Sequence, residues 1–268
     1  MSNSTGGNKE YQNSGKRTKK PKLLSIILGI ILLVIGAYRG VMPQLPEEFQ
    51  VDLGPLLSET SHTSSTSNTS NAMVNLDNIP KYSGKPYVVI NQNKPYFTQE
   101  EITKESFEYY SPLDSLGRCQ MVIASIGTDI MPTEKRENIS HVKPTGWHSV
   151  QYDFISTGSL YNRCHLIGHQ LTGENANPNN LITGTRYLNV DGMLPYEELV
   201  AEYVIDTGNQ VMYRVTPIFE GNNLVASGVL MEGLSVEDGG KGVQFCVYCY
   251  NVQPGVKINY SNGDNKEA

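Results

Sequence analysis

Lysine and arginine are scarce in most of this chain. Of its 21 basic residues, seven lie within residues 1–39, which hold only one of the 27 acidic residues. The rest of the sequence has 14 basic and 26 acidic residues, a formal charge near −12. Such a balance excludes a broad basic surface for polyanions. Two interpretations stay open: one local groove is basic, or the domain has no polymeric anion as substrate. The basic residues available for a groove are Lys135, Arg136, Lys143, Arg163, Arg186 and Arg214.

Cysteine motifs and zinc motifs are also sparse. Cys246 and Cys249 form a C-x-x-C pair, but without a second pair neither a zinc site nor a redox motif is indicated. His165 and His169 have the spacing of a zinc helix, but the residue after His165 is not the glutamate that such a site requires. A disulfide between Cys119 and either cysteine of the pair stays open.

No apolar run reaches the length of about 20 residues that is typical of a membrane-spanning helix. The best candidate, Leu23–Tyr38, runs for 16 residues without a charge, about 24 Å as a helix. It is longer than the apolar core of a secretory signal, and no clear small-x-small cleavage site follows it. Because basic residues precede it, we expect a cytoplasmic tail at 1–22 and a signal anchor at 23–42, with the remainder exported. The alternative is a cleaved signal and a secreted form.

The exported part divides into a linker, a domain and a tail. Residues 43–75 are rich in Ser and Thr and poor in apolar side chains, so they cannot bury enough surface to order themselves and predict a flexible linker. Residues 76–260 suffice for one compact core. Residues 261–268 are expected to be a disordered tail.

Within this domain, β-branched and aromatic runs predict strands. A helix is predicted from Pro195 to about Val204, with Leu199, Val200 and Tyr203 on one face. Mostly antiparallel strands with inserted helices indicate the α+β fold class. The predicted strands are Tyr87–Ile90, Gln120–Ala124, Gln210–Thr216, Leu224–Met231 and Val243–Tyr250.

A short stretch in the second half of the chain gathers the side chains of a polar site. His165 can take a proton near neutral pH. Arg163 and Arg186 present planar forks of donors that suit phosphate oxygens. Asn180 and Asn189 carry neutral oxygens that suit a hard cation such as Mg²⁺. A base, a phosphate clamp and a lightly held divalent ion together predict metal-assisted hydrolysis of a phosphodiester.

The motif Asn162-Arg163-Cys164-His165, followed by Asn189, resembles the signature of the DNA/RNA non-specific endonucleases of the ββα-metal (His-Me finger) type. That signature reads Asp-Arg-Gly-His with a later Asn, so this chain departs from it at its first and third positions. The similarity is greatest to membrane-anchored DNA-entry nucleases and secreted streptococcal-type DNases, and covers about residues 75–260. It implies a ββα-metal nuclease fold with a central, mostly antiparallel sheet.

The resemblance also implies a role for each matching residue. His165 would be the general base that activates water, and Asn189 the direct ligand of Mg²⁺, or of Mn²⁺ in its place. Arg163 would lie close to the scissile phosphate. Asn180 and Glu197 would orient metal-bound water or neighbouring side chains. Further contacts to nucleic acid are expected from Arg186, Asn162, Lys143 and Arg214.

These roles predict an endonuclease on the outer face of the cytoplasmic membrane that cuts DNA, and RNA as well if it is sugar-non-specific, and leaves 5′ phosphates. Its expected partners are nucleic acid, the membrane and a DNA-uptake machinery. A second hypothesis is a surface module that keeps the nuclease fold and binds nucleic acid or a protein without cutting. The acidic balance and the changes at Asn162 and Cys164 favour the module, whereas the retained His165 and Asn189 favour the enzyme.

Overall fold

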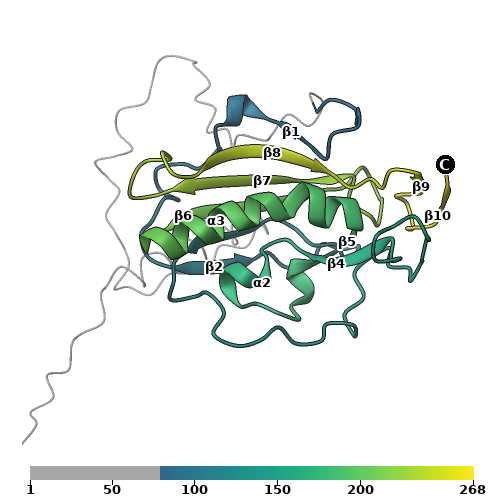
Figure 1. The fold of residues 1–268 in the computed structure, drawn as a ribbon, viewed down its shortest axis with the longest axis horizontal. Helices are drawn as coiled ribbons and strands as arrows, with labels where there is room; N and C mark the ends of the chain where they lie inside the picture. Colours follow the sequence, from purple (N-terminus) through teal and green to yellow (C-terminus); the bar gives the residue numbers. More distant parts are fainter. Residues whose placement is uncertain (1–78) are drawn as a thin grey trace, which may run out of the picture. The chain divides into compact units, whose positions relative to one another are not determined.

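The computed structural model describes residues 79–268 (Figure 1). The predicted tail, anchor and linker lie outside the described residues. Within residues 79–268, none of the helices has both the length and the apolar character needed to cross a membrane.

The centre of the described region is a six-stranded sheet in which every neighbouring pair is antiparallel. The strand order is β1-β8-β7-β6-β3-β2. With α3 packed against it, the sheet confirms the predicted α+β fold class. The strands are β1 (Tyr87–Val89), β2 (Phe107–Tyr110), β3 (Val122–Ile126), β6 (Val211–Ile218), β7 (Gly228–Ser235) and β8 (Gln244–Tyr250).

Strand β7 begins four residues later than predicted. Leu224 and Val225 have the apolar character of a strand, but their backbone groups bond elsewhere. The Leu224 carbonyl accepts the Thr145 hydroxyl, and the Val225 amide donates to the Tyr260 carbonyl. A side-chain pattern alone does not reveal such partners, so it placed the start of the strand too early.

Helix α3 (Leu194–Thr207) runs alongside the strands of the large sheet, in front of β6 and below β7 and β8 in the view of Figure 1. Pro195 stands in its first turn, where a missing amide costs nothing, and Gly208 ends it in the left-handed conformation. Val200 and Val204 are buried in the main core, whereas Leu199 is 39% exposed. The predicted helix is therefore confirmed and extends three residues further, to Thr207; of the side chains predicted on one face, Val200 is buried and Leu199 is exposed.

A separate two-stranded ribbon carries the polar stretch. It pairs β4 (Tyr161–His165) with β5 (Leu181–Thr185) in antiparallel register, so that His165 lies opposite Leu181. Between and after these strands come three short helical elements and the start of α3. They are α2 (His169–Thr172), the 3₁₀ turn η5 (Pro178–Asn180) and the π-helical turn η6 (Leu188–Met193); another 3₁₀ turn, η4 (Asn91–Asn93), follows β1.

The last residues are ordered rather than frayed, which corrects the predicted tail. Strand β10 (Asn265–Glu267) pairs with β9 (Val256–Ile258). Two tyrosines hold this hairpin: Tyr152 donates to the Asn265 side chain at 2.7 Å and Tyr161 to the Gly263 carbonyl at 2.8 Å. These bonds join segments more than one hundred residues apart.

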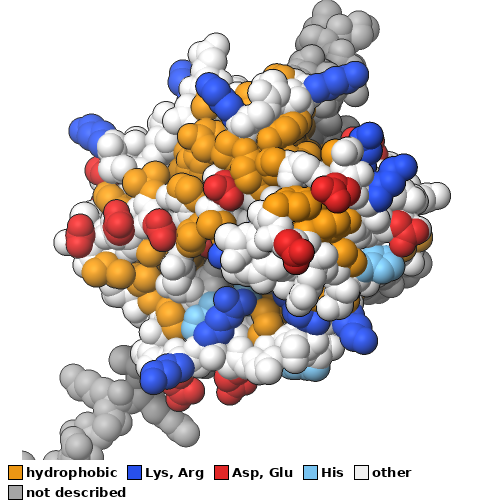
Figure 2. Space-filling view, turned by 45° about the vertical axis from the view of Figure 1, so that its right-hand side comes forward, with side chains coloured by type: hydrophobic (Ala, Val, Ile, Leu, Met, Phe, Trp, Pro, Cys, Tyr) orange, Lys and Arg blue, Asp and Glu red, His pale blue; other side chains and the backbone are white. Residues whose placement is uncertain are grey.

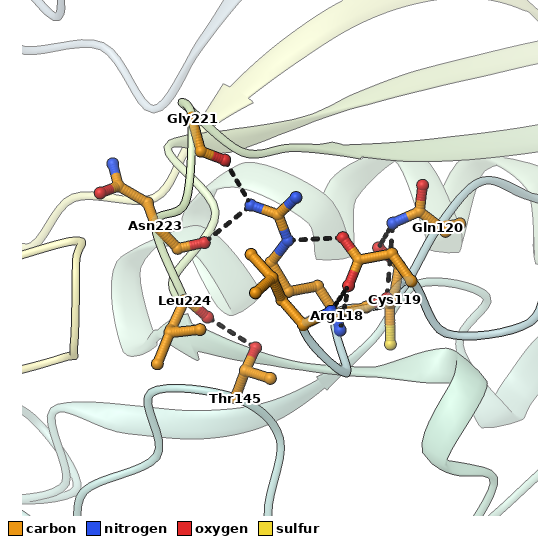
Figure 3. Close-up of polar contacts among 9 residues, drawn as sticks. Arg118, Cys119, Gln120, Thr145, Gly221, Asn223 and Leu224 are labelled. Carbon is orange, nitrogen blue, oxygen red and sulfur yellow. Dashed lines mark hydrogen bonds and ion pairs between the residues drawn. The ribbon is translucent and has the colours of Figure 1, made fainter.

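Polar side chains join the loop before β3, which carries Arg118, and the long loop before β4, which carries Thr145, to the turn between β6 and β7 (Figure 3). Arg118 donates to the carbonyls of Gly221 and Asn223, at 2.8 and 3.0 Å, and so holds the turn between β6 and β7. The Thr145 hydroxyl donates to Leu224 in the same turn at 2.6 Å, while Thr183 of β5 donates to the Thr145 carbonyl at 2.9 Å. The ribbon and the large sheet thus position the same loop.

All four cysteines are buried free thiols. No disulfide joins Cys119 to Cys246 or Cys249, which answers the question that the sequence left open. Cys119 instead donates to two backbone carbonyls, those of Pro178 and Leu181. Their burial raises the pKa of each thiol, which keeps the cysteines unreactive.

Candidate active site

A cavity of about 600 Å³ lies where the ribbon, α2 and the start of α3 meet. His165, Asn189 and Glu197, which stand on three different elements, all line it. On one face of the molecule, Lys, Arg and His side chains gather below a hydrophobic patch (Figure 2). The basic groups that line the cavity are Arg136, Arg163, Arg186, His165 and His169.

His165 ends strand β4 and is only 6% exposed. Its Nε2 lies 2.7 Å from the carbonyl oxygen of Asn175, which can only accept a hydrogen bond, so Nε2 carries the proton. Nδ1 is then the free acceptor, and the Arg136 Nη2 donor lies 3.3 Å from it. Burial, followed by the charge of Arg136, lowers the pKa of His165 to about 4. The imidazole is therefore neutral at physiological pH and its tautomer is set.

Arg163 also lines the cavity, but its donors are turned to the protein. Nε donates to the Val142 carbonyl and Nη2 to the Ser140 carbonyl, and the guanidinium stacks 4.0 Å from the centre of the Trp147 ring. These contacts hold the loop that precedes β4. The geometry makes Arg163 an anchor of the cavity wall, with little of its fork left for a phosphate.

Arg186 presents the opposite case. It follows β5, and its backbone amide is fixed to the Leu160 carbonyl at 2.8 Å. Its side chain lines the cavity, and its buried Nε has no hydrogen-bond partner among the described residues. Arg186 therefore retains donor capacity that a ligand can use.

The cavity also contains oxygens suited to a hard cation. Asn189 stands on η6 and Glu197 in the first turn of α3. The Glu197 carboxylate lies against Gly168, where a Cβ atom would come within 2.9 Å of Oε2. None of the ion pairs found in residues 79–268 involves Glu197, and burial raises its pKa to about 8.

A nearby divalent cation would favour the ionised form of this half-buried carboxylate. In residues 79–268, no group of three or more His, Cys, Asp and Glu side chains is placed to hold a metal. Mg²⁺ usually keeps several of its waters and binds few protein ligands, so one amide and one carboxylate are a sufficient set. The residues present thus fit a hard divalent ion.

Asn180 is a supporting residue rather than a lining one. Its side chain is completely buried and bonds twice to the backbone of Ile167, accepting from its amide and donating to its carbonyl, each at 2.9 Å. Both amide groups of Asn180 are therefore satisfied within the protein. The structure places it behind the turn that follows His165, not in the cavity.

The two departures from the family signature differ in their consequences. Asn162 lines the cavity and keeps a buried, unpartnered Nδ2. Cys164 points into the main core, away from the cavity. Its sulfur fills the space beside Gly184, where a Cβ atom would overlap Sγ. The added side chain at position 164 is accommodated because residue 184 has none.

Two expected substrate contacts lie outside the cavity. Arg214 donates to both carboxylate oxygens of Glu232, at 2.7 and 3.0 Å, and to Glu101 at 2.9 Å. Its guanidinium also lies 4.6 Å from the centre of the Phe97 ring. Lys143 is exposed and is not among the lining residues. The structure does not bring Arg214 or Lys143 to the site.

Three lining residues escaped identification as site residues from the sequence. Arg136 lies in the long loop between β3 and β4, where the sequence marks it only as one basic residue among several. Trp147 lies in the same loop and packs against Arg163. Gln170, on α2, carries no signal in the sequence at all. Their positions depend on how the loop and α2 fold over the end of β4.

The fold matches that of known nucleases. The structure of NucA from Streptococcus agalactiae with magnesium ion bound is 25% identical over 67% of this chain and 86% of that chain, with a TM-score of 0.61. The same protein with no metal bound is 25% identical over 76% and 100%, with a TM-score of 0.62. The structure of Sda1 nuclease with bound zinc ion, 24% identical over 69% and 97% with a TM-score of 0.57, shares the fold.

Residues 96–236 match the model of a protein family described as DNA/RNA non-specific endonuclease. This chain belongs to that family, as the resemblance predicted, and is a phosphodiester hydrolase. Nucleic acid is the substrate that membership implies. No curated protein matches the chain significantly.

Proposed function

We propose that this protein is a metal-dependent endonuclease that cuts DNA, and RNA as well, and leaves 5′ phosphates. The observation that carries the proposal is the state of His165: its Nε2 carries the proton and donates to the Asn175 carbonyl, and its Nδ1 is an unprotonated acceptor that lies 3.3 Å from Nη2 of Arg136. A histidine held in this tautomer is prepared to accept a proton from water.

His165 accepts the proton of the attacking water at Nδ1, while the Asn175 carbonyl keeps the ring oriented. Arg136 and Arg186 donate to the phosphate oxygens, which gain negative charge as the water attacks. Arg163 positions the loop before β4, which forms the cavity wall behind these two arginines. Asn180 acts through the Ile167 backbone, which fixes the turn between His165 and α2, and is therefore a positioning residue.

Asn189 and Glu197 would hold the divalent cation. When bound, Mg²⁺ or Mn²⁺ supplies positive charge to the phosphate and to the departing 3′ oxygen. The NucA structure with magnesium ion bound supports this choice of metal.

We also propose that the domain is displayed outside the cell. Its support is the sequence alone: a basic tail at 1–22, an apolar anchor at 23–42 and a Ser- and Thr-rich linker at 43–75. In this arrangement the nuclease domain begins near residue 76. Protease added to intact cells should remove the domain and leave the tail protected. Detection of the domain only after the cells are opened would contradict this orientation.

The enzymatic proposal is tested with supercoiled plasmid and with RNA. The full-length chain, purified in detergent, should cut both with Mg²⁺ or Mn²⁺ and neither with chelator. Asn189→Ala should raise the metal concentration needed for half-maximal cleavage by about tenfold or more. Undiminished cleavage in chelator would rule out the metal, and an unchanged metal requirement in the variant would rule out Asn189 as its ligand.

A further inference from the structure

Three residues that line the cavity each carry a buried donor without a partner among the described residues. Among the buried side-chain nitrogens and oxygens of the described residues, those without a hydrogen-bond partner are Asn162 Nδ2, Gln170 Nε2, Asn175 Nδ2 and Oδ1, Arg186 Nε and the Tyr213 hydroxyl. Asn162, Gln170 and Arg186 line the same cavity. A buried polar group without a partner is unfavourable. Three such groups on residues of one cavity are therefore candidate contacts for a ligand.

The three donors come from separate elements. Asn162 is on β4, Gln170 is on α2, and Arg186 directly follows β5. Asn162 pairs with Gly184 across the ribbon, which brings it near Arg186. No single mobile segment carries all of them, so the ribbon and α2 hold the set in place.

The chemistry of the set favours an anion. All three unpartnered atoms are N–H groups, and an arginine has no acceptor in any orientation. A metal ion requires oxygens, and those of the cavity come from Asn189 and Glu197 on η6 and α3. The cavity therefore has a set of oxygens for a cation and a distinct set of donors for an anion.

The cavity is also larger than one phosphate requires. Its volume of about 600 Å³ lies within the range of about 300–1,000 Å³ that is typical of pockets for ligands larger than one phosphate. Arg136 lies beside Nδ1 of His165, where the scissile phosphate must come. Space and donors remain for a second group of the same polymer.

We propose that Asn162, Gln170 and Arg186 form a second subsite, which binds the phosphate adjacent to the scissile one in a polynucleotide. This inference rests on the proposed function, because it places a neighbouring phosphate relative to the cleavage reaction. Arg186 then contacts both phosphates, and Gln170 contacts only the neighbouring one. The enzyme prefers a chain with consecutive charged linkages over an isolated phosphodiester.

The test uses thymidine oligomers whose phosphates are replaced by neutral methylphosphonates. One oligomer keeps a single phosphate, and two others keep in addition the phosphate on its 5′ or its 3′ side. The full-length chain with Mg²⁺ cuts each, and kcat/KM is measured at the shared linkage. For the wild type, one of the two neighbours should raise kcat/KM about tenfold, the effect of a hydrogen bond to a charged group.

Gln170→Leu should reduce that preference severalfold, and Gln170→Glu should reduce it further because a carboxylate repels the neighbouring phosphate. Gln99→Leu, an exposed glutamine outside the cavity, is the matched control and should keep the wild-type preference. Circular dichroism establishes that the variants are folded.

Two results would overturn the subsite while leaving the nuclease intact. In one, the wild type cuts plasmid normally but neither neighbouring phosphate changes kcat/KM. In the other, Gln170→Leu and Gln170→Glu lower kcat/KM equally for oligomers with and without the neighbour, which indicates a structural role. A wild type that fails to cut plasmid with any metal would overturn the subsite together with the proposed function.

Discussion

Two polar clusters in this domain use similar residues in opposite ways. On the large sheet, Arg214 is bound by Glu232 and Glu101, and the side chains of Arg214 and Glu232 are only 12% and 2% exposed. In the cavity, Arg186, Asn162 and Gln170 keep buried donors without partners. We call these the closed cluster and the open cluster. The closed cluster has completed its bonds within the chain, whereas the open cluster requires a ligand to complete them.

The difference shows how structural and functional arginines are told apart. Residue type does not separate Arg214 from Arg186, because both offer the same fork of donors. Their hydrogen-bond partners separate the two arginines. Arg214 donates to two carboxylates, one of which belongs to Glu232, its register neighbour on β7. A negatively charged domain can thus present a basic site locally, because its acids neutralise some arginines and leave others free.

The largest expected effect is on the closed cluster. Arg214→Ala would leave the Glu232 carboxylate buried without its partner, and should cost about 3–5 kcal/mol of unfolding free energy. Denaturant titration with circular dichroism measures this loss. A loss below about 1 kcal/mol would show that the ion pairs of Arg214 contribute little to the stability of the fold.

The matched change in the open cluster should reduce cleavage and leave stability nearly unchanged. Arg186→Ala removes a donor that bonds to no protein side chain, so unfolding free energy should change little. Cleavage of plasmid with Mg²⁺ should fall about 10²-fold, because a charge-stabilising donor is lost. If Arg186→Ala is as destabilising as Arg214→Ala, the distinction between the clusters is wrong.

Asn180 belongs to the site, yet its side-chain hydrogen bonds are all made within the protein. Asn180→Ala removes both bonds to the Ile167 backbone and should cost about 1–3 kcal/mol of unfolding free energy. Asn180→Asp keeps the acceptor but turns a buried carboxylate oxygen toward the Ile167 carbonyl, so its loss of stability should be at least as large. Both variants should need no more metal than the wild type, whereas a raised metal requirement would place Asn180 at the cation after all.

The smallest expected effect is on the pH dependence. His165 must be unprotonated to act as the base, and burial and Arg136 lower its pKa to about 4. The acid limb of kcat/KM should therefore lie near pH 4 rather than near the unperturbed value of about 6.5. Arg136→Gln removes one cause of the shift and should move that limb to higher pH. A wild-type limb at about 6.5 would contradict the buried, neutral state of His165.

Much of the fold follows from the sequence because its strands are long and rich in β-branched and aromatic residues, as in β6 and β8. Strand β4 was missed since Asn162, Arg163 and His165 carry no such pattern. The sequence also led to His165, Asn189, Glu197 and Arg186, which the fold brings to one cavity. The positions of Arg214 and Asn180 depend on partners that no local pattern reveals, such as Glu232 and the Ile167 backbone.

One measurement tests the central claim most directly. Nicking of supercoiled plasmid with Mg²⁺ should fall by about 10³-fold in His165→Ala, whose fold is checked by circular dichroism, because the general base is lost. His141→Ala, an exposed histidine outside the cavity, should nick like the wild type. Full metal-dependent nicking by a folded His165→Ala would contradict the account and move the catalytic centre away from this cavity.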